Sequence, residues 1–418
     1  MKLFARLTLL ATGVLLLAHY LPSGYWLVAD KEKRLPFVFY SCISNEFLLN
    51  RFVNGEIERT DPQGRHFERE EFENLLPLDN YMQLYKDRRM PKEINGLAVT
   101  PEKLRRDRIN LRIKPALLDS PAVALYPLIE SDSGRVRLEM PGDLLRLTGT
   151  PVFIDVKSNT VNAAKSAKFT AAFQAAQFAF PVKLVGGNPN ILKPYDEGYY
   201  LTDSRNAIYQ LRQVRGEPEL KKLAGLVPPD QRAQLDTLKP RYLHVQEQDN
   251  HEVRLVIVEE GGQVDLIIGP DYRLVTLPLQ KYDPAAMNLT VRGDMLNRLV
   301  TVNDDNHLEA IALDRDYKLL NRYTESQPSR AERPAGRVAA VLFPFTLDFE
   351  SDDSGFVGFD LAAGAGTAAL LNLGWLLLAA AWLWWRKQAP IRRLPELAAV
   401  AVGGIFGVIL ILLVPTVE

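Results

Sequence analysis

Three long apolar runs near the two ends of the chain constrain its fold more than any other feature. They extend over Leu7–Ala29, Leu361–Trp385 and Leu397–Val417, and none of them contains Asp, Glu, Lys or Arg. Roughly 20 helical residues cross the hydrocarbon core of a bilayer, which is about 30 Å thick, so each run is predicted to be a membrane helix. The predicted segments are an anchor at 1–29, a large extracytoplasmic domain at 30–355, membrane helices at 361–385 and 397–417, and a basic link at 386–396.

Basic residues next to these runs predict their orientation. Lys2 and Arg6 precede the first run, and the link carries Arg386, Lys387, Arg392 and Arg393. Lys and Arg in short loops stay on the cytoplasmic side of a membrane. We therefore expect a bacterial inner-membrane protein with a cytoplasmic N-terminus, a periplasmic domain, a cytoplasmic link and Glu418 outside.

A cleaved signal peptide is the alternative for the first run. No small-x-small cleavage pattern follows it, and apolar character continues through Tyr25, Trp26, Leu27 and Val28. These features favour an uncleaved anchor, and the large domain is outside in either case.

Composition excludes several classes of function. The formal net charge of the 418 residues is −1, so no basic field is available for nucleic acid. The single Cys42 excludes an internal disulfide and a cysteine-based zinc site. His244 and His251 lie seven apart in strand-like sequence, which is not a metal-ligand spacing. We expect no metal and no cofactor, and the absence of a nucleophile elbow, a Walker loop or a dinucleotide fingerprint favours a protein that is not an enzyme.

An internal repeat predicts that the large domain is mainly β. Leu255–Val258, a Gly-Gly turn and Val264–Ile267 are followed by the pair Asp271-Tyr272. The same order recurs 44 to 45 residues later, in Leu299–Val302, Leu308–Ile311 and Asp316-Tyr317. Strand-like runs around turn residues predict hairpins, and a period of about 40–50 residues is typical of β-propeller blades.

Other hairpin-like units precede this repeat. Together they predict a propeller-like domain of about five blades, closed by a strand at Val341-Leu342-Phe343, with a pair of β-sandwiches or an irregular β domain as alternatives. Helices are expected at 68–89, divided by Pro77, and at 162–178. The preceding units are Phe37–Tyr40 with Ile57, Leu128-Ile129 with Val136–Leu138, Pro151–Ile154 with Lys157–Asn159, and Tyr199–Leu201 with Ile208–Leu211.

Two groups of residues are candidates for recognition. In the membrane runs, Gly403 and Gly407 are four apart on one helix face and allow close approach of another helix, while Asn372 can hydrogen-bond across helices. This packing could serve the chain's own helices or a partner membrane protein. In the large domain, the polar and aromatic cluster Asp196, Glu197, Tyr199 and Tyr200 is the candidate binding site. The alternative is a turn that stabilises the fold.

The chain resembles an uncharacterised bacterial family of membrane-anchored proteins that is classed as a domain of unknown function. The matching residues are Glu70-Glu71-Phe72, Leu75-Leu76-Pro77, Tyr81, Leu84, Asp87, Met90-Pro91, Gly96, Phe180-Pro181, Gly187-Asn188-Pro189, Lys193–Tyr200 and Phe343-Pro344-Phe345. The resemblance implies genes near those of ABC-type transporters, and hence an accessory or sensing subunit whose partners are an ABC permease and its ATPase. It transfers no active site. A periplasmic envelope-processing enzyme and a ligand-free structural scaffold remain the alternatives.

Overall fold

The computed structural model describes residues 2–29, 34–119, 123–349, 357–361, 364–386 and 393–414. The chain forms two compact units. The β unit is Leu35–Glu325, and the helical unit combines Met1–Arg34 with Ser326–Glu418. The β unit is thus inserted into the helical unit and is connected to it at both of its ends.

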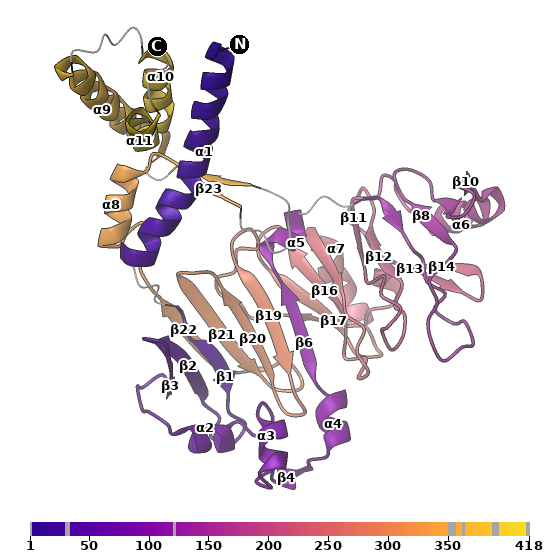
Figure 1. Cartoon of the computed structure of the whole chain (residues 1–418). Helices are drawn as coiled ribbons and strands as arrows, with labels where there is room; N and C mark the ends of the chain where they lie inside the picture. Colours follow the sequence, from indigo (N-terminus) through magenta and orange to yellow (C-terminus); the bar gives the residue numbers. More distant parts are fainter. Residues whose placement is uncertain are drawn as a thin grey trace. The chain divides into compact units, whose positions relative to one another are not determined.

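The β unit is built from antiparallel sheets that follow simple meanders (Figure 1). The first sheet contains β1 (Phe37–Tyr40), β2 (Phe47–Val53) and β3 (Glu56–Thr60). The next two contain β7 (Leu125–Tyr126), β8 (Asp143–Arg146), β9 (Val152–Asp155) and β10 (Thr160–Val161), and β11 (Leu184–Gly187), β12 (Tyr199–Thr202), β13 (Ile208–Val214) and β14 (Glu217–Lys222). The fourth contains β15 (Pro240–Val245), β16 (Val253–Glu259), β17 (Val264–Ile268) and β18 (Arg273–Thr276). The fifth contains β6 (Ile109–Ile113), β19 (Asn288–Gly293), β20 (Arg298–Asn303), β21 (His307–Leu313) and β22 (Leu319–Ser326).

Buried apolar clusters join these sheets into a row. The β1–β3 sheet packs on the β6/β19–β22 sheet, which packs on the β15–β18 sheet. The β11–β14 sheet and then the β7–β10 sheet complete the row (Figure 1). The chain therefore places its first sheet and β6 at one end, crosses to the far end for β7, and returns sheet by sheet.

The repeat predicted from the sequence is present in the structure. Strands β16, β17 and β18 correspond to β20, β21 and β22. The two Asp-Tyr pairs also adopt the same unusual backbone, because Tyr272 has φ +53° and Tyr317 has φ +65°. Bulky residues rarely adopt positive φ, so the shared conformation marks an equivalent turn before the last strand of each sheet.

The expectation of a closed propeller is wrong, although the domain is mainly β. The row is open, because within the described part of the chain neither a strand pairing nor a buried apolar cluster joins the β1–β3 sheet to the β7–β10 sheet. Val341-Leu342-Phe343 is not a closing strand, since the first two residues end helix α8 (Pro334–Leu342), which begins with proline at a helix N-terminus. Val136–Leu138 forms no strand either, and β7 pairs with β8 instead.

Short helices connect the sheets. Pro77 separates α2 (Arg69–Leu75) from α3 (Tyr81–Lys86), as predicted. Phe169 and Phe173 of α6 (Ala163–Ala175) are fully buried. The other elements are β4 (Glu93–Ile94), β5 (Leu97–Ala98), α4 (Pro101–Arg106), α5 (Pro115–Asp119), α7 (Arg232–Thr237) and two single-turn helices at Leu223–Gly225 and Pro229–Gln231.

The helical unit contains α1 (Lys2–Ala29), α8, β23 (Thr346–Asp348), β24 (Gly358–Asp360), α9 (Gly364–Trp385), α10 (Leu394–Gly403) and α11 (Ile405–Leu413). Phe4–Ala29 of α1 and Gly366–Trp385 of α9 are long and apolar enough to cross a membrane. Of the four basic residues in the predicted link, the structure describes Arg386 and Arg393, whereas Lys387 and Arg392 lie outside the described residues. Glu418 also lies outside them.

The third predicted membrane helix is not a single helix. It breaks at Gly404, whose φ of +53° an L-residue rarely adopts. At 1.5 Å per residue, α10 and α11 are about 15 Å and about 14 Å long, so neither spans the core of a bilayer. Helix α11 leaves the direction of α10 and packs against it, since a Cβ added to Gly407 would lie 2.4 Å from the backbone nitrogen of Val400.

Candidate functional site

The predicted binding residues occupy a tight turn that leads into β12. Gly198 has φ +74°, and a Cβ at this position would lie 2.1 Å from the carbonyl oxygen of Leu211. Glycine is therefore required for the chain to approach β13 here. The turn buries every predicted residue, with exposed fractions of 6% for Asp196, 4% for Glu197, 5% for Tyr199 and 0% for Tyr200.

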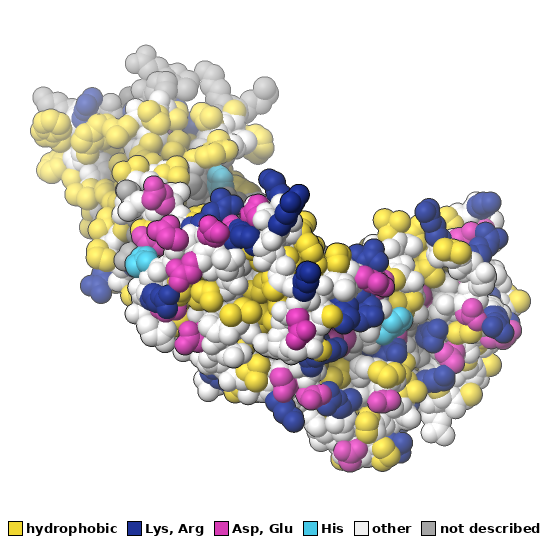
Figure 2. Space-filling model, turned by 90° about the horizontal axis from the view of Figure 1, so that it is seen from below, with side chains coloured by type: hydrophobic (Ala, Val, Ile, Leu, Met, Phe, Trp, Pro, Cys, Tyr) yellow, Lys and Arg dark blue, Asp and Glu magenta, His cyan; other side chains and the backbone are white. Residues whose placement is uncertain are grey.

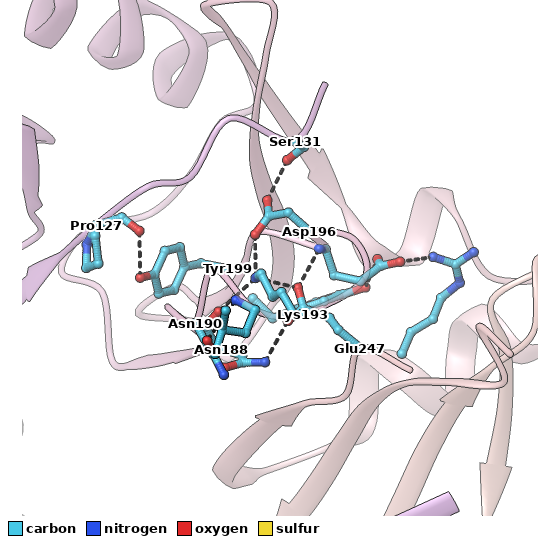
Figure 3. A network of polar contacts seen from close by, with 12 residues as sticks. Pro127, Ser131, Asn188, Asn190, Lys193, Asp196, Tyr199 and Glu247 are labelled. Atoms are coloured by element: carbon cyan, nitrogen blue, oxygen red, sulfur yellow. Dashed lines mark hydrogen bonds and ion pairs between the residues drawn. The ribbon is translucent and has the colours of Figure 1, made fainter. Parts of the chain in front are cut away.

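Lys193 lies at the centre of this buried cluster (Figure 3). Its ammonium group donates to Asp196 Oδ1 at 2.5 Å, to Glu247 Oε1 at 2.7 Å and to the carbonyl oxygen of Asn188 at 2.7 Å. An ammonium has three donors, and all three are used. Asp196 also accepts from Ser131 Oγ at 2.5 Å. Burial raises the pKa of the Glu247 carboxyl, and the Lys193 ammonium opposes the shift.

Glu197 pairs with Arg254 and not with Lys193. Its carboxylate pairs with Arg254 of β16 and accepts from Gln210 Nε2 at 2.8 Å. The Arg254 guanidinium lies over the ring of Tyr272, 4.7 Å from its centroid, and Tyr272 donates to Gln210 Oε1 at 3.2 Å. These contacts join the β11–β14 sheet to the β15–β18 sheet.

The two tyrosines of the cluster are also held within the fold. Tyr199 donates its hydroxyl to the carbonyl oxygen of Pro127 at 3.0 Å (Figure 3). Tyr200 packs in the apolar cluster with Leu243 and Leu255. Asp196 and Glu197 thus pair with separate cations and do not form an acid–base pair facing a common space. This geometry favours a joint between adjacent sheets over a catalytic site.

A second cluster of charged residues lines a recess of about 60 Å³ that the sequence analysis did not identify. The lining side chains come from the segment around α3, from α4 and β6, and from β1, β19 and β20. They are Tyr40, Leu78, Asp79, Tyr81, Leu104, Arg108, Ile109, Asn110, Arg292, Asp294, Asn297 and Leu299. Because these residues are distant in the sequence and belong to no recognised motif, composition and spacing give no signal for them.

The charges of the recess are incompletely paired. Asp79 lines the recess and is accessible to solvent, and its side chain makes no hydrogen bond or ion pair with any residue that the structure describes. Partial desolvation by the walls of the recess raises the pKa of Asp79 to about 6, and Arg292 opposes that shift. Burial also lowers the pKa of Arg292 and raises that of Asp294. Two carboxylates, of Asp79 and Asp294, and two guanidinium groups, of Arg108 and Arg292, therefore line one small recess.

The predicted packing residues of the membrane runs lie within the helical unit. Asn372 of α9 donates to the carbonyl oxygens of Ala401 at 3.2 Å and Val402 at 2.9 Å, near the end of α10. Gly403 faces Val14 of α1, and Gly407 faces the backbone of α10. Each of these three residues thus serves contacts between the chain's own helices.

Comparison with known proteins decides the family. A family model described as a domain of unknown function (DUF4857) matches residues 37–313. The chain belongs to this DUF4857 family. Both the Lys193 cluster and the Asp79 recess lie inside the matched region of the DUF4857 domain, whereas α1 and α8 to α11 lie outside it. The expectation of an uncharacterised family is confirmed, while the ABC transporter neighbourhood stays a prediction.

Other comparisons add little. No curated protein matches the chain. A solved structure titled "Structure of Dos1 propeller" is similar at a TM-score of 0.26 and 11% identity. The match covers 71% of this chain and 62% of that one, so the DUF4857 protein spans less than two thirds of its length. A likeness at this TM-score carries no argument about function.

Proposed function

We propose that this protein is a non-enzymatic accessory or sensing subunit of a membrane complex. In this proposal the helical unit lies in a bacterial inner membrane and the β unit lies in the periplasm. The β unit binds a ligand or protein, and the helices pass that state to an ABC permease and its ATPase. The observation that carries the proposal is that one compact helical unit is formed by both ends of the chain, with the β unit inserted between them.

The two ends of the β unit are tied together. Arg51 of β2 donates to both carboxylate oxygens of Glu325 in β22, at 2.7 Å each. Leu35 and Tyr323, which also lie close to the two connections, pack on one apolar cluster. A bidentate arginine–carboxylate pair fixes geometry as well as charge. A change in the β unit therefore reaches both connections together.

The helices of the helical unit pack closely, which would let them move together when the β unit changes. Helix α1 contributes Leu10, Val14 and Ala18 to a buried cluster with Phe343 and Phe406. Arg6 of α1 forms an ion pair with Glu396 of α10, whose side chain is fully buried. Charged groups inside a membrane protein are costly and mark functional positions. This pair fixes α1 against α10.

The visible surface of the β unit supports a binding protein without a strong positive or negative electrostatic field. Lys, Arg, Asp and Glu side chains are interspersed over the visible face of the β unit (Figure 2). Hydrophobic side chains predominate on the visible face of the helical unit (Figure 2). Mixed charge argues against electrostatic capture of nucleic acid. The separate pairing of Asp196 and Glu197 supports the non-enzymatic proposal.

Affinity purification of the tagged full chain from mild detergent, followed by mass spectrometry, tests the proposal. We expect an ABC permease and its ATPase in near-equal amounts. A partnerless protein after gentle crosslinking would overturn it.

A matched pair of variants makes the result specific to the helical unit. Gly374 of α9 and Gly24 of α1 both have open space where a Cβ would stand. Small residues on an open, apolar helix face let a partner helix approach closely. Gly374 lies in the middle of α9 between the exposed Leu370 and Leu377, whereas Gly24 follows the polar Ser23 near the end of α1. We expect Gly374→Leu to reduce the recovered permease and Gly24→Leu to leave it unchanged.

A further inference from the structure

We propose that the Asp79 recess binds a small zwitterion, a molecule that carries one ammonium and one carboxylate group. The proposal deepens the sensing role given above and depends on it for its biological meaning, but binding itself can be measured independently. The Lys193 cluster is unsuitable for this role, because its charges already pair with each other.

The first argument is the presence of opposite charges that do not neutralise each other. Asp79 and Arg292 interact electrostatically across the recess, yet the structure forms no ion pair between them. Arg292 gives one of its donors to the carbonyl oxygen of Val38 and stacks over Phe39, 5.1 Å from the ring centroid. Asp79 is accessible to solvent, so a ligand that enters the recess can reach its carboxylate directly. A ligand with both signs would supply the missing partner to each group.

The second argument is the polar lining between these charges. Asn110, Asn297 and the phenol rings of Tyr40 and Tyr81 line the same recess. Asp294 is fixed in place, because its Oδ1 accepts from the backbone nitrogens of Leu296 at 2.7 Å and Asn297 at 2.8 Å. Fixed polar groups around an orienting charge are typical of small-molecule sites.

The third argument is size. The recess has a volume of about 60 Å³, whereas a single water needs roughly 10–15 Å³ measured in the same way. It therefore holds several waters or one small organic ion. A peptide, a nucleotide or an oligosaccharide is too large, so the commitment is to a molecule of the size of glycine or alanine.

The position of the recess links it to the proposed signalling. Tyr40 belongs to β1, while Asn110 of β6 and Arg292 of β19 belong to the adjoining sheet. These are the two sheets that carry the connections to the helical unit and the Arg51–Glu325 pair. A ligand here would bridge them.

Titration calorimetry of the full chain in detergent tests the inference, with glycine and alanine as probes. We expect one site per chain. N-acetylglycine lacks the ammonium group, methylamine lacks the carboxylate and glucose lacks both, so each should bind at least tenfold more weakly. Absence of heat from glycine and alanine up to about 10 mM, which exceeds the roughly 1 mM dissociation constant of a weak complex, would overturn the inference. Equal binding of N-acetylglycine or glucose would overturn it as well.

Variants locate the site. Asp79→Asn and Arg292→Gln should weaken glycine by roughly thirtyfold or more, because each leaves one ligand charge without a partner. Glu102→Gln and Arg105→Gln change exposed charges of α4 nearby and should leave affinity unchanged. Far-UV circular dichroism confirms that each variant is folded, and unchanged binding by folded Asp79→Asn contradicts the inference.

The two proposals can fail independently. If the chain recovers the permease but binds no zwitterion, the ligand site is rejected and the accessory role is kept. If the chain binds the zwitterion but recovers no partner, only the accessory role is rejected.

Discussion

At the scale of single residues, the Lys193 ammonium group compensates the buried negative charges of two carboxylates. Its side chain is 3% exposed and contacts Asp196 and Glu247. Lys193→Met leaves both acids without their cation, and removing one partner of a buried ion pair costs about 3–5 kcal/mol. We expect a loss of this size in the free energy of unfolding, measured by denaturant titration followed by circular dichroism.

An exposed pair provides the control for that change. Lys168 and Glu217 are paired at 2.7 Å, with side chains 45% and 67% exposed. Lys168→Met should cost less than about 1 kcal/mol. Adding Glu247→Gln to Lys193→Met should recover part of the loss. Equal losses for the two single variants would show that Lys193 contributes no more than a surface charge.

Asp79 predicts a pH dependence of stability at the same scale. Its folded-state pKa is raised to about 6 from an ordinary value of 3.8. Between these values the folded protein binds more protons than the unfolded chain, so this group lowers stability as pH rises. The penalty is complete above about pH 6 and disappears as the pH falls below 3.8. Asp79→Asn should therefore raise the melting temperature at pH 8, and the gain should shrink towards pH 4. A difference that does not vary with pH would contradict this assignment.

At the scale of elements, sequence patterns correctly predicted those helices and hairpins that depend on interactions between nearby residues. The repeated hairpins, the division of helix 68–89 at Pro77 and helix α6 follow from side-chain alternation, proline geometry and helical spacing. The apolar run Val341-Leu342-Phe343 was ambiguous, because short apolar runs fit a strand or a helix equally well. The break at Gly404 was missed because glycine is tolerated in membrane helices, and the sequence alone does not give its φ of +53°.

Gly404 gives a prediction at this scale. A Cβ there would lie 2.4 Å from Asn372 Oδ1, and φ is +53°. Gly404→Ala should destabilise the helical unit by about 1–3 kcal/mol through backbone strain and should displace the amide that caps α10. Gly374→Ala, which meets no atom within 4 Å on α9, is the control, and it should be neutral or stabilising by up to about 1 kcal/mol. Thermal unfolding in detergent measures both, and similar melting temperatures would show that the break is not strained.

At the scale of the whole molecule, the order of the sheets in space could not be read from the sequence. Strand β6 pairs with β19, about 180 residues further on, and the first sheet packs on the last one along the chain. Such pairings are set by burial between distant segments, and one sequence carries no signal of them. The same limit applies to the sites. Asp196, Glu197, Tyr199 and Tyr200 are neighbours in the sequence and were predicted, whereas Lys193 was noted only within the family resemblance. The other members of that cluster, Glu247 and Arg254, and the whole recess around Asp79 and Arg292 come from separate elements.

The sharp bend between α10 and α11 changes the expected topology of the whole chain. A single third helix would place the segment after residue 414 on the side opposite the 386–396 link. In the structure α10 is about 15 Å long, roughly half of the hydrocarbon core, and α11 packs against α10 instead of continuing it. Gly403 faces Val14 and a Cβ on Gly13 would touch Leu410, so α11 reaches no further along α1 than the end of α10 does. Reporter domains fused after Arg386 and after Val414 should therefore report the same, cytoplasmic compartment, and a fusion after Glu325 should report the periplasm. Opposite compartments for the first two fusions would restore the single spanning helix and contradict the fold of the helical unit.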